Sequence, residues 1–194
     1  YRRRLMLSML TEEPDAYLAQ LQAAKLNDDV EVAHYAATAV AQISKESDLK
    51  LQQLERAFKT DPSAQNLNEY CDFLGEYLGS GLAEGRVAQI QRQQYARLLA
   101  RRCEREDTLE LRIRYATALA DVGQIDEAQA VTDQLVLDVP EEQEVWMLCL
   151  RLAVMRRDGD EVHRVIDAID NQHVYLSAAN REQLAFWRDG EEAR

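Results

Sequence analysis

The chain has 194 residues, of which 46% are hydrophobic and 30% charged, a balance that supports a packed core and argues against intrinsic disorder. Its 35 acidic and 23 basic side chains give a net charge of −12, and such a surface repels phosphate backbones, so we expect no nucleic-acid partner. With only seven Gly, three Pro and no alternating apolar run, the composition predicts an all-α fold of helices joined by brief turns.

The first residues, from Tyr1 to Arg4, combine an aromatic side chain with three positive charges. This pattern is typical of the cytoplasmic edge of a transmembrane helix. We therefore expect a membrane segment upstream of Tyr1, although the same residues also suit an ordinary basic helix start. Within the chain itself no signal peptide is recognisable, and no window reaches the roughly 18 apolar residues that a membrane span needs.

Apolar residues at helical spacing predict ten or eleven helices. Between them, Asn27-Asp28-Asp29 caps the helix that follows, Asp61-Pro62 ends a helix, and Gly79-Ser80-Gly81 forms the most flexible stretch. The expected helices cover residues 3–10, 14–24, 30–43, 49–58, 67–78, 87–103, 109–123, 125–137, 141–155, 160–169 and 176–187.

One stretch, residues 109–142, resembles a tetratricopeptide (TPR) repeat, which is a pair of antiparallel helices. Small residues that allow close packing of the two helices stand at repeat positions 8 and 20, as Ala116 and Ala128. Gly123 supplies the turn and Pro140 stops the second helix. The match predicts that this pair stacks with neighbouring pairs to form a core.

The rest of the chain matches the repeat less well. Within 109–142 itself, Arg112 and Thr132 replace the usual aromatic residues, whereas Trp146 stands where Trp is expected in the following unit. We predict a single TPR-like domain, a right-handed superhelix of helix pairs with capping helices at both ends. Its expected parts are capping helices in 1–30, repeat units 31–62, 65–108, 109–142 and 143–175, and a capping helix with a tail in 176–194.

The first helices of the repeats are expected to line a concave face that binds a peptide or helix of a partner. The alternative is that additional helices cover these residues as part of the core. The residues predicted to be exposed on this face are Tyr35, Glu69, Phe73, Glu76, Ile113, Thr117, Asp121, Met147 and Arg151.

We find no motif that carries chemistry, and we predict no catalytic, cofactor-binding or metal-binding residue and no enzymatic activity. None of the histidines has a second ligand at metal spacing, and His34 is interpreted as a structural residue of a packed helix. The run Asp158-Gly159-Asp160 is interpreted as a turn between helices rather than a metal-binding motif. The widely spaced Cys71, Cys103 and Cys149 are typical of small buried hydrophobes in a reducing compartment.

Three stretches resemble a known family: EVAHYAATAVAQISKESDLKLQQLERAF (31–58), LNEYCDFLGEYLGSGLAEGRVAQIQRQQYARLL (67–99) and LSAANREQLAFWR (176–188). In this order around a TPR unit, they are similar to the cytoplasmic region of the TPR-bearing E subunit of Pel-type exopolysaccharide (biofilm) machinery. The resemblance implies a scaffold at the cytoplasmic face of the bacterial inner membrane, with transmembrane helices before the TPR region. The partners it implies are a cyclic-di-GMP receptor subunit, a cytoplasmic glycosyltransferase and a membrane transporter.

The resulting hypothesis is a non-enzymatic protein-interaction scaffold of an exopolysaccharide synthase complex. The alternative is a peptide-binding TPR domain of a soluble regulatory or chaperone-type protein. A third hypothesis is an enzyme that uses scattered carboxylates, which only residues brought together from different helices would support.

Overall fold

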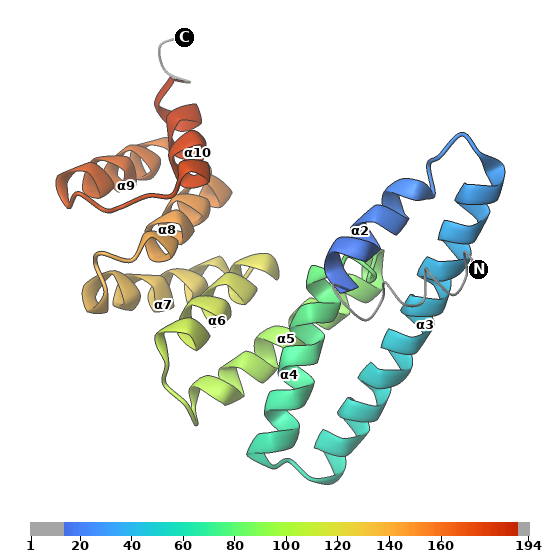
Figure 1. Ribbon diagram of the computed structural model, residues 1–194. Helices are drawn as coiled ribbons and strands as arrows, with labels where there is room; N and C mark the ends of the chain where they lie inside the picture. The colour runs from blue at the N-terminus through green and yellow to red at the C-terminus, as the bar shows by residue number, and fades with distance from the viewer. Residues whose placement is uncertain (1–13, 190–194) are drawn as a thin grey trace. The chain divides into compact units, whose positions relative to one another are not determined.

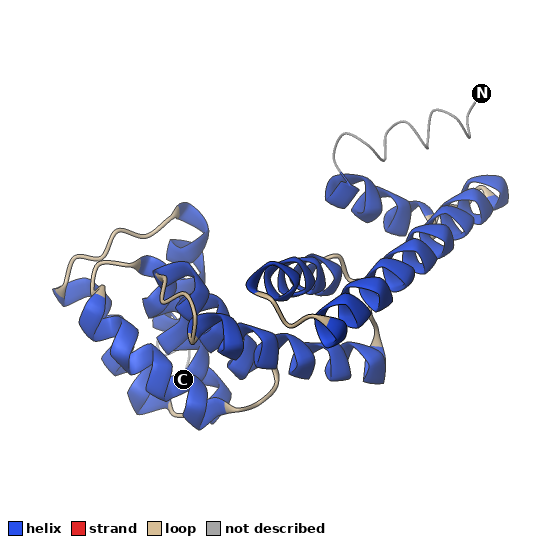
Figure 2. Ribbon diagram, turned by 90° about the horizontal axis from the view of Figure 1, so that it is seen from below, coloured by secondary structure: helices blue, strands red, loops and turns tan. Residues whose placement is uncertain are grey.

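The computed structural model describes residues 14–189, with side chains described for residues 18–188. These residues form nine α-helices and no strand (Figures 1 and 2), so the all-α expectation is confirmed for this part of the chain. The predicted helix 3–10, the basic run at residues 1–4 and the tail after residue 189 lie outside the described residues. None of the described helices is long and apolar enough to cross a membrane.

The chain divides into two compact units, residues 1–91 and 92–194. Unit 1 contains α2 (Pro14–Ala24), α3 (Val30–Thr60), α4 (Ala64–Gly79) and the first turns of α5 (Gly85–Cys103). Unit 2 contains the rest of α5 and five further helices. These are α6 (Leu109–Asp121), α7 (Ile125–Asp138), α8 (Gln143–Arg156), α9 (Gly159–Asn171) and α10 (Ala178–Asp189).

In unit 1, α3 is one helix of 31 residues (Figure 1), so the prediction of two helices, 30–43 and 49–58, was wrong. The polar residues 44–48 were interpreted as a break, but they include no Gly or Pro, and the backbone therefore continues as a helix through them. As a result, residues 31–62 hold one long helix instead of a helix pair. The start of α3 was predicted correctly, because Asp29 Oδ1 accepts from the backbone N–H of Glu31 at 2.9 Å.

Helix α3 is covered by different helices along its length. Leu21 of α2 and Ala36 of α3 are both buried in a small cluster near the start of α3. Towards its C-terminal half, α3 packs on α4, where the Tyr77 hydroxyl donates to Asp48 Oδ1 at 2.8 Å. The burial of Tyr77 and the neighbouring Asp48 carboxylate raise the pKa of Tyr77 to about 12.

Unit 2 is built from short helices that pack on their neighbours in sequence: α6 on α7, α7 on α8 and α8 on α9. The turn after α6 depends on Gly123, which has φ of +79°, in the region that a glycine adopts without strain. The backbone N–H of Gln124 donates to the Leu119 carbonyl, and that of Gly123 to the Ala120 carbonyl, which is the Schellman arrangement. The predicted turn is therefore confirmed.

The α6–α7 pair packs closely because its facing residues are small. Ala116 and Ala128 are fully buried in one cluster with Leu119, Leu148 and Leu152, which brings α8 into the same core. The small side chains of Ala116 and Ala128 are therefore buried between helices, as their size predicts.

The two residues of this pair that depart from the repeat pattern have polar partners. Thr132 is fully buried, and its hydroxyl donates to the Ala128 carbonyl at 2.7 Å. Arg112 forms an ion pair with Asp138 at 2.6 Å, and this bond holds the pKa of the Asp138 carboxyl below its usual value. The equivalent position of α8 holds Trp146, whose indole N–H donates to the Pro140 carbonyl at 2.6 Å.

Candidate functional site

The nine residues predicted for a concave face fall into both units, four in unit 1 and five in unit 2. In unit 1, Tyr35 is 54% exposed on the first part of α3, whereas Phe73 on α4 lies under the Lys50 ammonium, 4.2 Å from the ring centroid. Because Tyr35 and Lys50 are 15 residues apart on one helix, they are separated by roughly 22 Å. The structure therefore does not bring Tyr35 to Phe73. The two other residues of the unit 1 set, Glu69 and Glu76, are exposed on α4.

The five residues in unit 2 lie on two helices that contact each other, α6 and α8. We call them the α6–α8 face: Ile113, Thr117, Asp121, Met147 and Arg151. Asp121 and Arg151 form an ion pair of 2.5 Å across the two helices, with side chains 39% and 42% exposed. The three others are half-buried, and Met147 also packs against the core cluster around Trp146. The α6–α8 face thus combines partly exposed apolar surface with a charged pair.

The sequence prediction of the site missed five exposed large apolar residues of unit 2, namely Leu109, Leu137, Met155, Tyr175 and Phe186. Met155 is 42% exposed near the end of α8, and Phe186 is 70% exposed on α10. The repeat numbering contained a signal for Met155, because it occupies the thirteenth position of unit 143–175. For Phe186 there was none, because residues 176–194 were interpreted only as a cap.

The electrostatic character of unit 2 is strongly acidic. Residues 109–189 contain sixteen acidic and eight basic side chains, and all eight basic residues are arginines. Six of these arginines form ion pairs with carboxylates of the same stretch, among them Arg156 with Asp126 at 2.8 Å. Most of the positive charge is therefore already engaged within the chain, and an excess of carboxylates remains.

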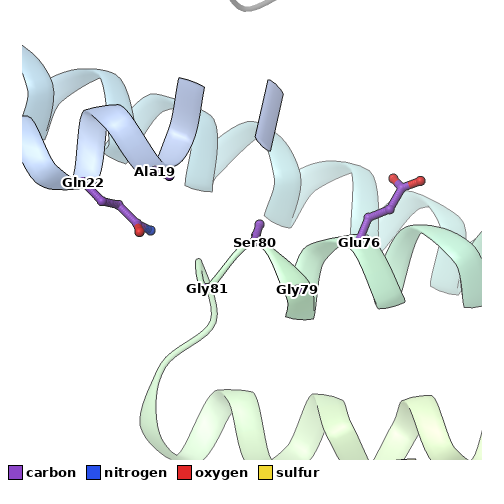
Figure 3. A pocket seen from close by; sticks show the side chains of 6 residues that line it. All are labelled: Ala19, Gln22, Glu76, Gly79, Ser80 and Gly81. Carbon is purple, nitrogen blue, oxygen red and sulfur yellow. The ribbon is translucent and has the colours of Figure 1, made fainter. Parts of the chain in front are cut away.

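Unit 1 contains a hollow of about 510 Å³ between α2 and the end of α4 (Figure 3). Gln22 extends from α2 and Glu76 from α4, and the backbone turn at Gly81 closes one side. The hollow is open to solvent, and its lining side chains carry one carboxylate and no positive charge. Its lining residues are Ala19, Gln22, Glu76, Gly79, Ser80 and Gly81. Of the predicted site residues, only Glu76 is among them.

The residues considered for chemistry occupy separate positions. Within the described part of the chain, no group of three His, Cys, Asp or Glu side chains is arranged to hold a metal ion. His34 is exposed, so its interpretation as a residue of a packed helix was wrong. Asp158 caps α9, where its Oδ1 accepts from the Glu161 N–H at 3.0 Å, which agrees with the interpretation as a turn.

None of the three cysteines forms a disulfide bond. Cys71 and Cys149 are buried as predicted, whereas Cys103 is only half-buried. Burial raises the pKa of Cys149 to about 12 and also raises the pKa of Cys103. A raised pKa keeps a thiol protonated at neutral pH, so the structure gives neither residue the character of an activated nucleophile.

Comparison of the chain with protein-family models, with curated proteins and with solved structures found no match in any of the three.

Proposed function

We propose that this protein is a non-enzymatic scaffold whose TPR-like helix pairs bind partner proteins through the α6–α8 face. The observation that carries the proposal is the packing of α6 on both α7 and α8. In TPR-like stacks, a first helix contacts its own second helix and the first helix of the next pair. This arrangement leaves one side of α6 and α8 for a partner.

The composition of that side supports binding rather than catalysis. Ile113 and Met147 supply apolar contact area, and the Asp121–Arg151 ion pair lies beside them. Half-buried apolar residues flanked by charges are the anchors and rim that protein interfaces use. The proposal assigns no catalytic residue.

The complex in which we propose that the protein acts is inferred from the sequence resemblance alone. A Pel-type exopolysaccharide complex at the bacterial inner membrane would supply a cyclic-di-GMP receptor subunit, a glycosyltransferase and a transporter as partners. Co-expression of the chain with each of these three subunits, followed by affinity purification, tests the setting. Retention of at least one subunit is expected, and retention of none would contradict it.

The binding face is tested in the same purification with single substitutions. Met147→Glu and Ile113→Glu are expected to reduce the recovered partner by about tenfold, because each puts an unpaired charge into the apolar contact area of the interface. Leu137→Glu on α7 is the control, since Leu137 is 76% exposed and lies outside the α6–α8 face. Circular dichroism confirms that each variant is folded. Equal recovery with all three variants would show that partners bind elsewhere.

A further inference from the structure

Helix α10 docks on α8 through its first turn. The side-chain oxygen of Gln143, the first residue of α8, accepts from the Ser177 backbone N–H at 2.9 Å and from the Asn180 side chain at 3.0 Å. Leu184 of α10 is buried in one cluster with Trp146 and Leu150 of α8. The start of α10 is thereby held beside the start of α8.

The three helices α6, α8 and α10 also begin in the same way, each after a residue whose side chain accepts backbone N–H groups of the first turn. These caps are Thr108, Glu142 and Ser177. Counting from the caps puts the three helices in a common register. The fifth residues are Ile113, Met147 and Glu182, and the ninth residues are Thr117, Arg151 and Phe186.

In this register Phe186 belongs to the same side of its helix as the α6–α8 face. It is also one of the most exposed large apolar residues of unit 2, and its ring lies edge-on to Trp187 at a centroid distance of 5.2 Å. Trp187 in turn packs against the buried cluster around Trp146. An aromatic ring that is exposed but supported from behind by a packed tryptophan is a preorganised anchor for a partner.

The charges of unit 2 indicate the chemistry of that partner. Carboxylates outnumber arginines two to one over residues 109–189, and most arginines are already paired within the chain. On the helices of this surface, Glu144 and Glu182 are exposed. An acidic partner would be repelled, whereas Lys and Arg side chains would find the carboxylate of Glu182 one helical turn before Phe186.

We infer that α10 extends the α6–α8 face, and that the combined surface binds a basic amphipathic segment of a partner protein with Phe186 as its apolar anchor. This inference rests on the proposed function and adds the class of ligand and one binding residue to it. The apolar side of the segment covers Phe186, and its basic side faces the carboxylates.

The experiment measures binding of a fluorescein-labelled amphipathic Lys/Leu peptide to the whole chain by fluorescence anisotropy. The expected result is that Phe186→Ala raises the Kd about tenfold, as truncation of an anchor does, whereas Leu137→Ala changes it by less than about twofold. Both side chains are at least 70% exposed, so neither variant is expected to unfold the protein. A matched Glu/Leu peptide is expected to bind at least about tenfold more weakly.

Three results of the peptide experiment would overturn the inference: equal loss of binding in Phe186→Ala and Leu137→Ala, equal affinity for the two peptides, or no binding of the Lys/Leu peptide. Sedimentation velocity gives a fourth such result. If Phe186→Ala converts a wild-type dimer to a monomer, a second copy of the chain occupies the surface instead of a partner segment. The proposed function has a separate test, the affinity purification. If Met147→Glu lowers partner recovery, the scaffold proposal is supported even when the Lys/Leu peptide does not bind.

Discussion

Helix α3 in unit 1 and helix α8 in unit 2 represent two ways to stabilise a helix. α3 buries three of its 31 residues, whereas α8 buries seven of its 14. Among the described helices, α8 packs on α6, α7, α9 and α10, whereas the main neighbours of α3 are α2 and α4. The comparison teaches that α3 depends mainly on helix propensity and capping, and that the short helices of unit 2 depend on close packing and defined turns.

The strongest test of this difference is a break in the middle of α3. Lys45→Pro is expected to lower the free energy of unfolding by about 3 kcal/mol, because proline removes a backbone N–H and clashes with the preceding turn. Urea titration followed by far-ultraviolet circular dichroism measures the change. Lys45 is exposed, so the control Lys45→Ala is expected to stay within about 0.5 kcal/mol of the parent. A similar result for both variants would mean that α3 does not act as one helix.

The dependence of unit 2 on close packing is tested by enlarging a small residue. Ala128→Leu is expected to cost about 2 kcal/mol, because the methyl group of Ala128 is fully buried between helices. Ala130→Leu on the same helix is exposed and is expected to cost less than about 0.5 kcal/mol. Tryptophan fluorescence during urea unfolding reports on unit 2, because both tryptophans, Trp146 and Trp187, lie there. Equal stability of the two variants would contradict the close packing of α6 and α7.

The turns of unit 2 are tested with two glycines that are expected to respond in opposite directions. Gly123→Ala is expected to destabilise by about 1 kcal/mol, because its φ of +79° is strained for a residue with a Cβ. Gly159→Ala is expected to stabilise by about 0.5 kcal/mol, since a Cβ there meets no atom within 4 Å and alanine favours the helix. Thermal unfolding of the two variants side by side measures both. If both substitutions shift the melting temperature in the same direction, the two glycines do not differ in the way expected here.

An effect of similar size is expected at the hydrogen bond that links the middle of α3 to α4. Tyr77→Phe is expected to cost about 1 kcal/mol at neutral pH, because it removes the hydrogen bond to Asp48. In the parent, the pKa of Tyr77 is raised from 10.0 to about 12, so the unfolded chain loses this proton first as the pH rises. Its contribution to stability is therefore complete below pH 10 and is lost as the pH rises towards about 12. Urea titrations are expected to show that the free energy of unfolding declines less over this pH range in Tyr77→Phe than in the parent. An equal decline in both proteins would show that Tyr77 does not cause it.

The helices and turns of unit 2 were predictable because their signals are local. Gly123, Pro140 and the cap Thr108 each mark an end of a helix within a few residues of sequence. The continuity of α3 was missed because the polar run 44–48 was interpreted as a break, although helix ends need an actual breaker or cap. Polar residues without Gly or Pro remain compatible with a helix, and Asp48 has its partner Tyr77 29 residues away.

By itself, the sequence determined the all-α class, most helix boundaries and the burial of Ala116 and Ala128 in one cluster, because propensity, capping and side-chain size act over one or two helices. Only the tertiary structure decided which side chains stay exposed: Phe186 on α10 and Met155 on α8 are open, whereas Thr132 is fully buried. Exposure depends on which helices pack together, and that is set by contacts between residues far apart in the chain. The pairing of Asp121 with Arg151 was decided in the same way, 30 residues apart in sequence and 2.5 Å apart in space.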